Sequence, residues 1–541
     1  MLRRTLSVFN LPIPVLRRAD RYPHFDVCVI GSGPGGLSAA MRAVSFGKKV
    51  CMVERSERTG GNDVWLGTLP SKTLWEISKL ASTVSNKGML SRFTDPAQLQ
   101  LPTADMIDGE RILKALYNAS ATKEEHLIDA VEAAGIQRIQ GTASFANSRE
   151  VDIHSDNAEY RTLSADYFII ATGSKPRDHP LYPCDHKYIT NSDDMFRLPV
   201  PKSMVIIGAG AMGCEFASML ANLGKTKVYV IDKAKHILPR EDADISMAVQ
   251  DSLAARGVTI HHDCHLFNLE TFEDPDTGVG CCQYSIQSAK DGAVESFIVD
   301  RALVTIGRRP NYSGLGLENT RMHLRDGYID TDAYRRCLPY DHIYCVGDAT
   351  RDAPTVPMAQ AAARIALQDM YGATPRQSLD VAPINNLSKS WFFEDEVASI
   401  GLSEKECRRE HIGYIVVKFN YDNTTRGIIA GSTNGFVKLL VSNDRQKKVL
   451  GVRAMGAHAG SVVEVVSLAV RRGLSVYELL HMNPSYPSVV SALVECARMA
   501  VGRGTRNPNL TSAVTMNEWM PPHFERGRAF YKEEKYQNKQ E

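Results

Sequence analysis

The sequence predicts an α/β protein with two Rossmann-like dinucleotide-binding domains and a smaller C-terminal α+β domain. Three observations carry this prediction: a Gly-rich turn at 31–36, a second at 208–213, and a change of pattern in the last third of the chain. Each turn lies between a β-branched strand and a helix of small residues, the setting that makes such a motif specific. A chain of 541 residues is also too long for a single core.

The first turn, GSGPGG, follows the strand-like DVCVI and opens a helix that leads to a strand ending at Glu54. Gly31 makes the tight turn, Gly33 lets the backbone approach a pyrophosphate, and Gly36 lets the helix pack on the strand. The free N–H groups of the helix start then face the phosphates. Glu54 lies about twenty residues on, where a carboxylate accepts hydrogen bonds from ribose hydroxyls. We therefore predict a dinucleotide site here.

The second turn repeats this pattern with Gly208, Gly210 and Gly213, and Asp232 closes the following strand. An acid at this place favours NAD, because it bonds the ribose 2′-OH and repels a 2′-phosphate. Three basic side chains follow at once and soften that repulsion: Lys233, Lys235 and His236. The sequence therefore predicts NAD and leaves NADP open.

Two dinucleotide folds in one chain suggest that hydride passes between two bound dinucleotides. Three strand-to-loop segments indicate that one of them is a flavin, and they are YFIIATGSKPR (167–177), LVTIGRRPN (303–311) and HIYCVGDAT (342–350). In the last of these, a strand ends on Gly347-Asp348, where the carboxylate is placed to hold a ribityl or phosphate-proximal hydroxyl. We therefore expect FAD at the first turn.

The last third of the chain predicts a hairpin over 435–456, around Asn443 and Asp444, and then two helices, over 458–473 and 487–502. Strands followed by helices are typical of an α+β module, here a candidate dimer interface. The tail 510–541 is polar and charged without a clear period. We expect it to be disordered or to pack on a partner protein.

Composition limits the remaining possibilities. The net charge of +1 gives no general attraction to nucleic acid or to an anionic membrane, and no apolar run is long enough to cross a bilayer. Residues 1–24 are rich in Arg and hold no acid before Asp20, which is typical of a mitochondrial presequence and predicts the matrix. The eleven cysteines have no metal-ligand spacing, so we predict no metal; one adjacent pair, Cys281 and Cys282, lies in a loop-like stretch.

Taken together, these motifs resemble the class I pyridine nucleotide-disulfide oxidoreductases over residues 25–505. GSGPGG, ATGSKPR, GAGAMGCE, TIGRRPN, CVGDA, PMAQAAAR (357–364) and VASIGLSEKE (397–406) occur in the family's order. The resemblance implies an FAD-binding domain at 25–176 and 307–375, an NAD-binding domain at 177–306, and a homodimerisation domain at 380–509. It adds cofactor contacts for FAD, at Lys72, Thr172, Gly173, Asp348 and Ala359, and for NAD, at Gly307.

The departures from the family fall on one reaction. Family members carry two cysteines before Pro-Ser-Lys, and the matching residues here are Asp63 and Thr68. A partner-chain His-Pro, with a Glu five residues past the His, serves the family as an acid-base dyad. Its match here is Tyr486 with Ser491; a second register places Asn483 and Ser488 there. Thiol–disulfide exchange needs a thiolate and a second sulfur, which these residues do not supply.

The nicotinamide half of the family's site is retained. The resemblance implies that Lys72 pairs with Glu215 beside the flavin N5, where a fixed cation stabilises the negative charge that arrives with hydride. We expect an FAD enzyme that exchanges hydride with NAD(P)H and passes electrons to a small-molecule acceptor other than a disulfide, as a transhydrogenase or diaphorase does. The competing interpretation is a catalytically degenerate scaffold or assembly subunit. A dihydrolipoyl dehydrogenase with relocated thiols, such as Cys281 and Cys282, is a remote third.

Overall fold

The computed structural model describes residues 22–86, 95, 106–155, 162–273, 280–372, 387–504 and 514–521. The predicted presequence, apart from its last three residues, lies outside them. The chain forms two compact units. The first unit contains residues 1–63, 123–175 and 309–379, and the second contains 64–122, 176–308 and 380–541. The predicted domain boundaries stay predictions.

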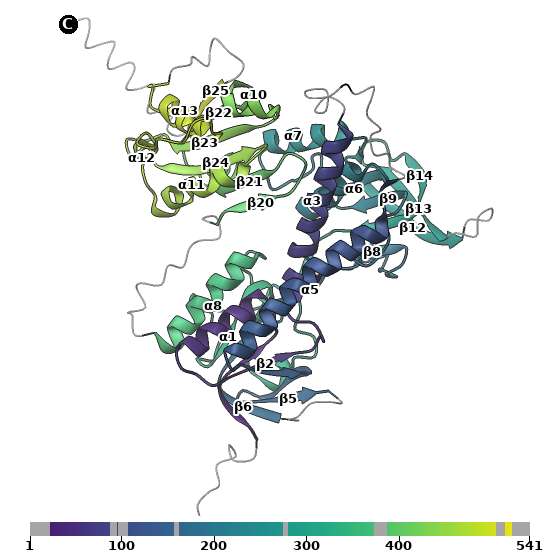
Figure 1. Ribbon diagram of the computed structural model, residues 1–541, viewed down its shortest axis with the longest axis vertical. Helices are drawn as coiled ribbons and strands as arrows, with labels where there is room; N and C mark the ends of the chain where they lie inside the picture. The colour runs from purple at the N-terminus through teal and green to yellow at the C-terminus, as the bar shows by residue number, and fades with distance from the viewer. Residues whose placement is uncertain are drawn as a thin grey trace, which may run out of the picture. The chain divides into compact units, whose positions relative to one another are not determined.

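The first unit is built on a mostly parallel sheet with strand order β3-β2-β1-β6-β5-β4, in which β19 also pairs with β6. Alternate residues of β1 face opposite sides, as a strand requires. Val27 and Val29 pack with helices α1 and α8, which lie side by side (Figure 1), whereas Cys28 and Ile30 face the other core. The elements are β1 (His24–Ile30), α1 (Pro34–Ser45), β2 (Val50–Glu54), β3 (Gln137–Gln140), β4 (Thr142–Asn147), β5 (Glu150–His154), β6 (Thr162–Ile170), β17 (Leu324–Arg325), β18 (Tyr328–Ile329), β19 (Ile343–Cys345) and α8 (Val356–Tyr371).

The second unit begins with a parallel five-stranded sheet, order β11-β10-β9-β15-β8, and an antiparallel sheet, order β12-β13-β14. Its strands and helices are β8 (Ile189–Asn191), β9 (Ser203–Ile207), α6 (Ala211–Leu223), β10 (Lys227–Ile231), α7 (Ala243–Ala254), β11 (Thr259–His261), β12 (Cys264–Glu273), β13 (Gly280–Ser288), β14 (Val294–Val299) and β15 (Arg301–Val304). The chain passes between the units at β7 (Ser174–Pro176) and β16 (Arg308–Pro310), among other places.

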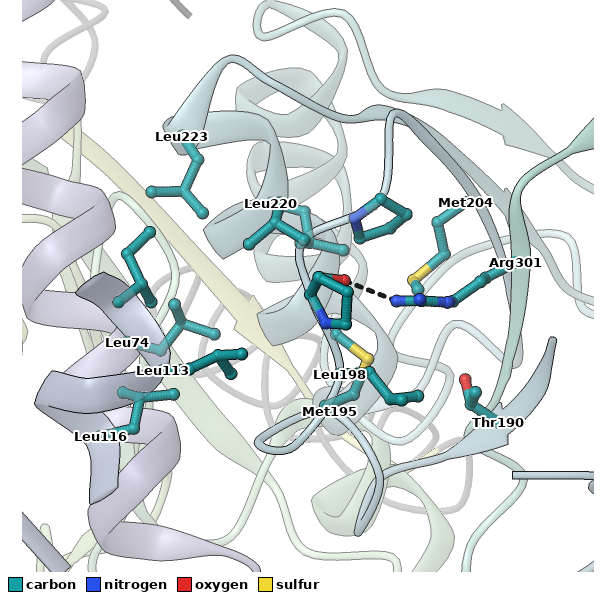
Figure 2. Close-up of a pocket in the computed structure, with 14 residues that line it drawn as sticks. Leu74, Leu113, Leu116, Thr190, Met195, Leu198, Met204, Leu220, Leu223 and Arg301 are labelled. Atoms are coloured by element: carbon teal, nitrogen blue, oxygen red, sulfur yellow. Dashed lines mark hydrogen bonds between the residues drawn. The ribbon is translucent and has the colours of Figure 1, made fainter. Parts of the chain in front are cut away.

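Helix α3 (Thr68–Ser85) packs against α6 in the second unit, beside the first half of α5 (Gly109–Ala133). Leucines from all three helices meet there, around a cavity of about 20 Å³ that the loop before β9 also lines (Figure 2). That volume is about what one water molecule needs, and the lining is mainly apolar. We interpret the cavity as a packing gap that leaves the α3–α6 contact intact.

The C-terminal module of the second unit is a sheet of order β20-β21-β24-β23-β22-β25 with α11 and α13 packed on one face. It contains the predicted hairpin, as β23 and β24, and both predicted helices. The elements are β20 (Lys389–Trp391), β21 (Val397–Gly401), α9 (Glu404–Arg409), β22 (Tyr414–Asn420), α10 (Thr425–Ala430), β23 (Phe436–Ser442), β24 (Val449–Met455), α11 (Ala459–Arg472), α12 (Val476–Leu479), α13 (Val490–Ala500) and β25 (Val514–Trp519).

Strand β25 corrects the prediction for the tail. Residues 514–519 pair antiparallel with β22, from Val514 opposite Phe419 to Trp519 opposite Tyr414. This part of the tail therefore packs on its own chain, while residues 510–513 and 522–541 lie outside the described residues. The predicted fold class itself is confirmed. Within the described residues no helix is both long and apolar enough to span a bilayer.

Candidate functional site

The first Gly-rich turn, in the first unit, has the geometry of a phosphate cradle. Gly31 has a φ of +108°, and a Cβ there would lie 2.4 Å from the carbonyl oxygen of Ala171. A Cβ on Gly36 would clash with the carbonyl oxygen of Gly31, so any larger residue at position 36 would push helix α1 away from the turn. Gly33, in contrast, faces open space with no heavy atom within 4 Å of a built Cβ. The open side lies at the start of α1, where unpaired N–H groups bind anions.

The surrounding residues of this unit fit FAD. Glu54 accepts hydrogen bonds from the Ser32 backbone N–H and hydroxyl, each at 2.8 Å, so the acid at the end of β2 is fixed beside the turn. The buried hydroxyl of Thr172 has no hydrogen-bond partner among the residues that the structure describes, which is the state expected of a group that binds a ligand. Asp348 accepts from the Ser174 hydroxyl at 2.7 Å. Gly173 has a φ of +66° beside these groups, and Ala359 packs at the start of α8.

The second turn repeats this cradle in the second unit. Gly208 has a φ of +109°, a Cβ on Gly213 would lie 2.0 Å from the Gly208 oxygen, and Gly210 faces open space. Asp232 accepts from the N–H groups of Ala209 at 2.6 Å and Ala234 at 2.8 Å. The last predicted NAD contact, Gly307, also has a positive φ, +108°.

A histidine that the sequence analysis missed lies directly after the strand beside Asp232. β11 runs parallel to β10, and His262 follows it directly. Burial lowers the pKa of His262, and the neighbouring His236 lowers it further against the opposing charges of Asp263 and Asp232. A lowered pKa keeps His262 neutral at pH 7, so it adds no positive charge that would attract a 2′-phosphate. His262 comes close to Asp232 through the parallel pairing of β10 and β11, and no local sequence motif indicates this.

Lys72 and Glu215 are brought together in the second unit. The Lys72 Nζ lies 2.9 Å from Glu215 Oε2, and the two side chains are 27% and 13% exposed. Lys72 lies on the first turns of α3 and Glu215 on α6, directly after the second Gly-rich turn. The close packing of α3 on α6 places these residues, 143 positions apart, side by side. The pair is thus a half-buried ion pair at the start of two helices.

The residues predicted to match the redox cysteines, Asp63 and Thr68, carry no sulfur. Asp63 lies in the short helix α2 (Gly61–Trp65), and Thr68 is the exposed first residue of α3. Ser71 and Pro70, from the retained Pro-Ser-Lys, are buried in α3, where the Ser71 hydroxyl donates to the Thr68 carbonyl at 3.1 Å. The loop that leads to α2 in the first unit is held by Glu124, a residue that the sequence did not single out. This buried carboxylate accepts from the Thr59 N–H and pairs with Arg58 at 3.1 Å.

The residues predicted to match the acid-base dyad are Tyr486 with Ser491 or, in the second register, Asn483 with Ser488. Tyr486 is 77% exposed, and its hydroxyl is hydrogen-bonded to that of Thr425 at 2.8 Å. The Ser491 hydroxyl donates to the Ser488 carbonyl at 2.6 Å, and Ser488 in turn accepts from the Val490 N–H. These serines therefore serve local turns. Asn483, in the second register, lies in the loop between α12 and α13.

The sequence predicts the adjacent cysteines in a loop, but they lie in strand β13. Cys281 and Cys282 are both buried, and neighbouring side chains of a strand point to opposite faces. Burial raises the pKa of Cys282 to about 12. A thiol with such a pKa is almost never a thiolate at neutral pH, so this pair is no replacement for a redox disulfide.

Comparison with known proteins assigns the chain to a family. Residues 25–364 match the pyridine nucleotide-disulphide oxidoreductase family, and residues 387–497 match the dimerisation domain of the same family. The chain belongs to this family of FAD-dependent oxidoreductases, whose members use FAD and NAD(H). These are the two cofactors predicted from the sequence.

Relatives and solved structures agree over nearly the whole chain. A dihydrolipoyl dehydrogenase from Mycobacterium bovis is 30% identical and one from Bacillus subtilis is 29% identical, each over 88% of this chain and 98% of the relative. The fold is similar to that of LpdA from Mycobacterium tuberculosis (24% identity) and of the HOCl-induced flavoprotein disulfide reductase RclA from Escherichia coli (22%). The TM-scores are 0.75 and 0.73, over 88% of this chain and 99% of each structure.

Proposed function

We propose that this chain is an FAD-dependent NAD(P)H oxidoreductase that delivers electrons to a non-disulfide acceptor, as a transhydrogenase or diaphorase does. One observation carries the proposal: the Lys72–Glu215 pair is assembled at 2.9 Å, while the matching redox positions are Asp63 and Thr68. The relatives named dihydrolipoyl dehydrogenase act on a dithiol. A dithiol route requires a thiolate and a second sulfur, and this chain offers neither at those positions.

Each half of the proposed reaction has residues to support it. Bound FAD supplies two-electron redox chemistry at the first Gly-rich turn, and Gly31, Gly33 and Gly36 provide the cradle for its pyrophosphate. Lys72 supplies a fixed positive charge for the electrons that arrive from the nicotinamide, and Glu215 holds that charge in place. The partial burial of the pair strengthens the interaction, because water screens it less.

The test is anaerobic rapid mixing of the flavin-loaded protein with NADH, followed by absorbance. NADH should bleach the flavin, and the long-wavelength thiolate-to-flavin charge-transfer band of dithiol relatives should be absent. Lys72→Met should slow bleaching by about a hundredfold or more while NADH binding changes only a few-fold, because the charge matters most in the transition state. Lys114→Met, at an exposed lysine of α5, is the matched control. A nicotinamide analogue or a quinone should reoxidise the protein, and lipoamide should not.

A scaffold without turnover is the second candidate, and the added strand β25 is the observation that favours it. Flavin bleaching by a nicotinamide nucleotide distinguishes the two proposals, because a scaffold needs no functional nicotinamide site. If neither NADH nor NADPH bleaches a fully flavin-loaded protein, the redox proposal fails.

We also propose a homodimer in the mitochondrial matrix. The match of residues 387–497 to a dimerisation domain supports the dimer, as do the exposed apolar side chains of Ile428, Ile429 and Tyr486. Family interfaces of this kind are usually isologous, with the same patch on both subunits. The Arg-rich, acid-poor start of the sequence supports the matrix. Light scattering of the purified protein and imaging of a C-terminally tagged chain test the two statements.

A further inference from the structure

The Lys72–Glu215 pair is contacted by a segment from the C-terminal module, residues 392–394. The backbone N–H of Phe392 donates to Glu215 Oε1 at 2.8 Å, and the other carboxylate oxygen, Oε2, takes the Lys72 ammonium. The Phe392 ring lies 4.5 Å from the Lys72 Nζ, the distance of a cation–π contact. We propose that Phe392 is a positioning residue that fixes the orientation of both members of the pair. This inference rests on the proposed function.

The segment is tied to the helices that carry the pair. The Trp75 indole N–H, on α3, donates to the Phe393 carbonyl at 2.7 Å, and the Trp75 and Phe392 rings meet edge to face at 5.1 Å. On α6, the Ser218 hydroxyl accepts from the Glu394 N–H at 3.0 Å. The two residues after Phe392 are therefore anchored, Phe393 to the helix of Lys72 and Glu394 to the helix of Glu215.

The side chain of Glu394 adds a third anchor. It accepts from the Asn222 amide at 2.8 Å and pairs with Arg256, which follows α7, at 3.3 Å. Before Phe392, strand β20 pairs with β21 as far as Trp391. The segment is therefore held on both sides and loses little additional entropy when the Phe392 N–H and ring are held in place. The C-terminal module thus extends into the nicotinamide half of the site.

The two contacts of Phe392 restrict different motions: the backbone N–H restricts rotation of the Glu215 carboxylate, and the ring restricts the Lys72 side chain. A carboxylate bound only through Oε2 is free to rotate and to follow the lysine, whereas the second bond at Oε1 fixes its plane. The ring restricts the flexible lysine side chain and covers the ammonium without neutralising it. A fixed, charged donor stabilises a transition state more than a mobile one, because it pays no reorganisation when charge arrives.

The competing explanation is that the Phe392 ring only fills space between α3 and the C-terminal module. Phe392→Leu separates the two, because it keeps an apolar side chain of similar bulk and the backbone N–H but has no π face. Phe392→Tyr keeps the π face and is the rescue variant. Phe46→Leu is the matched control: it removes a similar contact, between Arg42 and a ring at 4.6 Å, in the first unit.

The first readout needs no cofactor. Limited acylation of the apoprotein, quantified on the peptide that contains Lys72, measures how freely this amine moves. We expect Phe392→Leu to raise the Lys72 acylation rate about fivefold, since a partly buried cation–π contact is lost, and Phe392→Tyr to restore the wild-type rate. The second readout is flavin bleaching by NADH, which Phe392→Leu should slow about tenfold while NADH binding changes by less than about twofold.

The outcomes separate this inference from the function on which it rests. If Phe392→Leu matches wild type in acylation and in bleaching while Lys72→Met is slow, the positioning role is overturned and the proposed function stands. If Lys72→Met bleaches at the wild-type rate, Lys72 has no role in hydride transfer and the positioning role of Phe392 is overturned with it, whereas the proposed function fails only if neither NADH nor NADPH bleaches the wild-type protein. Equal loss of thermal stability in Phe392→Leu and Phe392→Tyr, with unchanged Lys72 acylation, means that the ring only packs. Phe392→Met replaces the leucine variant if that variant does not fold.

Discussion

Two acidic residues, Glu54 and Asp232, hold the two Gly-rich turns in the same way. The sequence predicts each as a ribose ligand from its place at the end of a second strand. The structure adds that each carboxylate also holds the Gly-rich turn, through the N–H groups of Ser32 and Ala209 respectively. Such residues are predictable, because a Gly-rich turn and its acid obey local backbone requirements. His262 and Phe392 reach their sites only through tertiary pairing and leave no local signal.

Asp232→Asn should relax the preference for NADH. The variant removes the negative charge that repels a 2′-phosphate but keeps an oxygen for one of the two backbone N–H groups. The ratio of kcat/KM for NADPH to that for NADH should rise about tenfold or more. Steady-state kinetics with both nucleotides measures this ratio. Asp251→Asn, at an exposed position of α7 in the same domain, should leave the ratio unchanged. An unchanged ratio in Asp232→Asn would remove Asp232 from nucleotide selection.

At the scale of elements, a buried ammonium joins α7 to the C-terminal sheet. Lys438 of β23 is 1% exposed, and its Nζ lies 2.8 Å from Asp242, 2.6 Å from Asp244 and 3.1 Å from Glu404. Asp242 precedes α7, whereas Glu404 begins α9. This cluster is not predictable from the sequence, because its members lie up to 196 positions apart and no local pattern distinguishes them from ordinary surface charges.

The pKa values of this cluster set the pH range in which it stabilises the fold. Burial alone would raise the pKa of Asp242, but Lys438 outweighs it and holds that pKa below its ordinary 3.8. Burial alone would lower the pKa of Lys438, but the carboxylates hold it above its ordinary 10.5. The Asp242 contribution is present above pH 3.8 and is lost as pH falls through the lowered pKa. The Lys438 contribution is present below pH 10.5 and is lost as pH rises through the raised one.

Lys438→Met should therefore cost stability in a pH-dependent way. At pH 7 it removes the ammonium that lies nearest to all three carboxylates, which costs about 3–5 kcal/mol for a buried pair. At pH 4 the carboxylates of the variant can take up protons, so the loss should be smaller. Thermal unfolding at both pH values measures the difference in Tm between variant and wild type. Lys290→Met, at an exposed turn, is the control. A loss that is equal at pH 4 and pH 7 would mean that the ammonium contributes packing alone.

At the scale of the whole molecule, the order of the motifs predicts the architecture, because each nucleotide fold needs a strand, a turn and a helix in sequence. The sequence did not predict β25. Its side chains are mostly exposed, so it lacks the alternation that marks a half-buried strand. It forms because the edge of β22 offers unpaired backbone groups, and its end is fixed where Trp519 stacks on Tyr414 with ring centroids 5.6 Å apart.

Removing β25 should expose that edge. A chain ending at residue 504 leaves the N–H and C=O groups of β22 without their partner strand, and an open edge is a template for pairing with other chains. We expect the shortened protein to bind FAD as before, because the first Gly-rich turn lies in the other unit, but to associate further as its concentration rises. Light scattering over a range of concentrations, with absorbance for flavin content, measures both. A chain ending at residue 521 keeps β25 and should behave as the full chain. If the 504 chain also does so, β25 is dispensable to the sheet, and its surface is left for a partner to use.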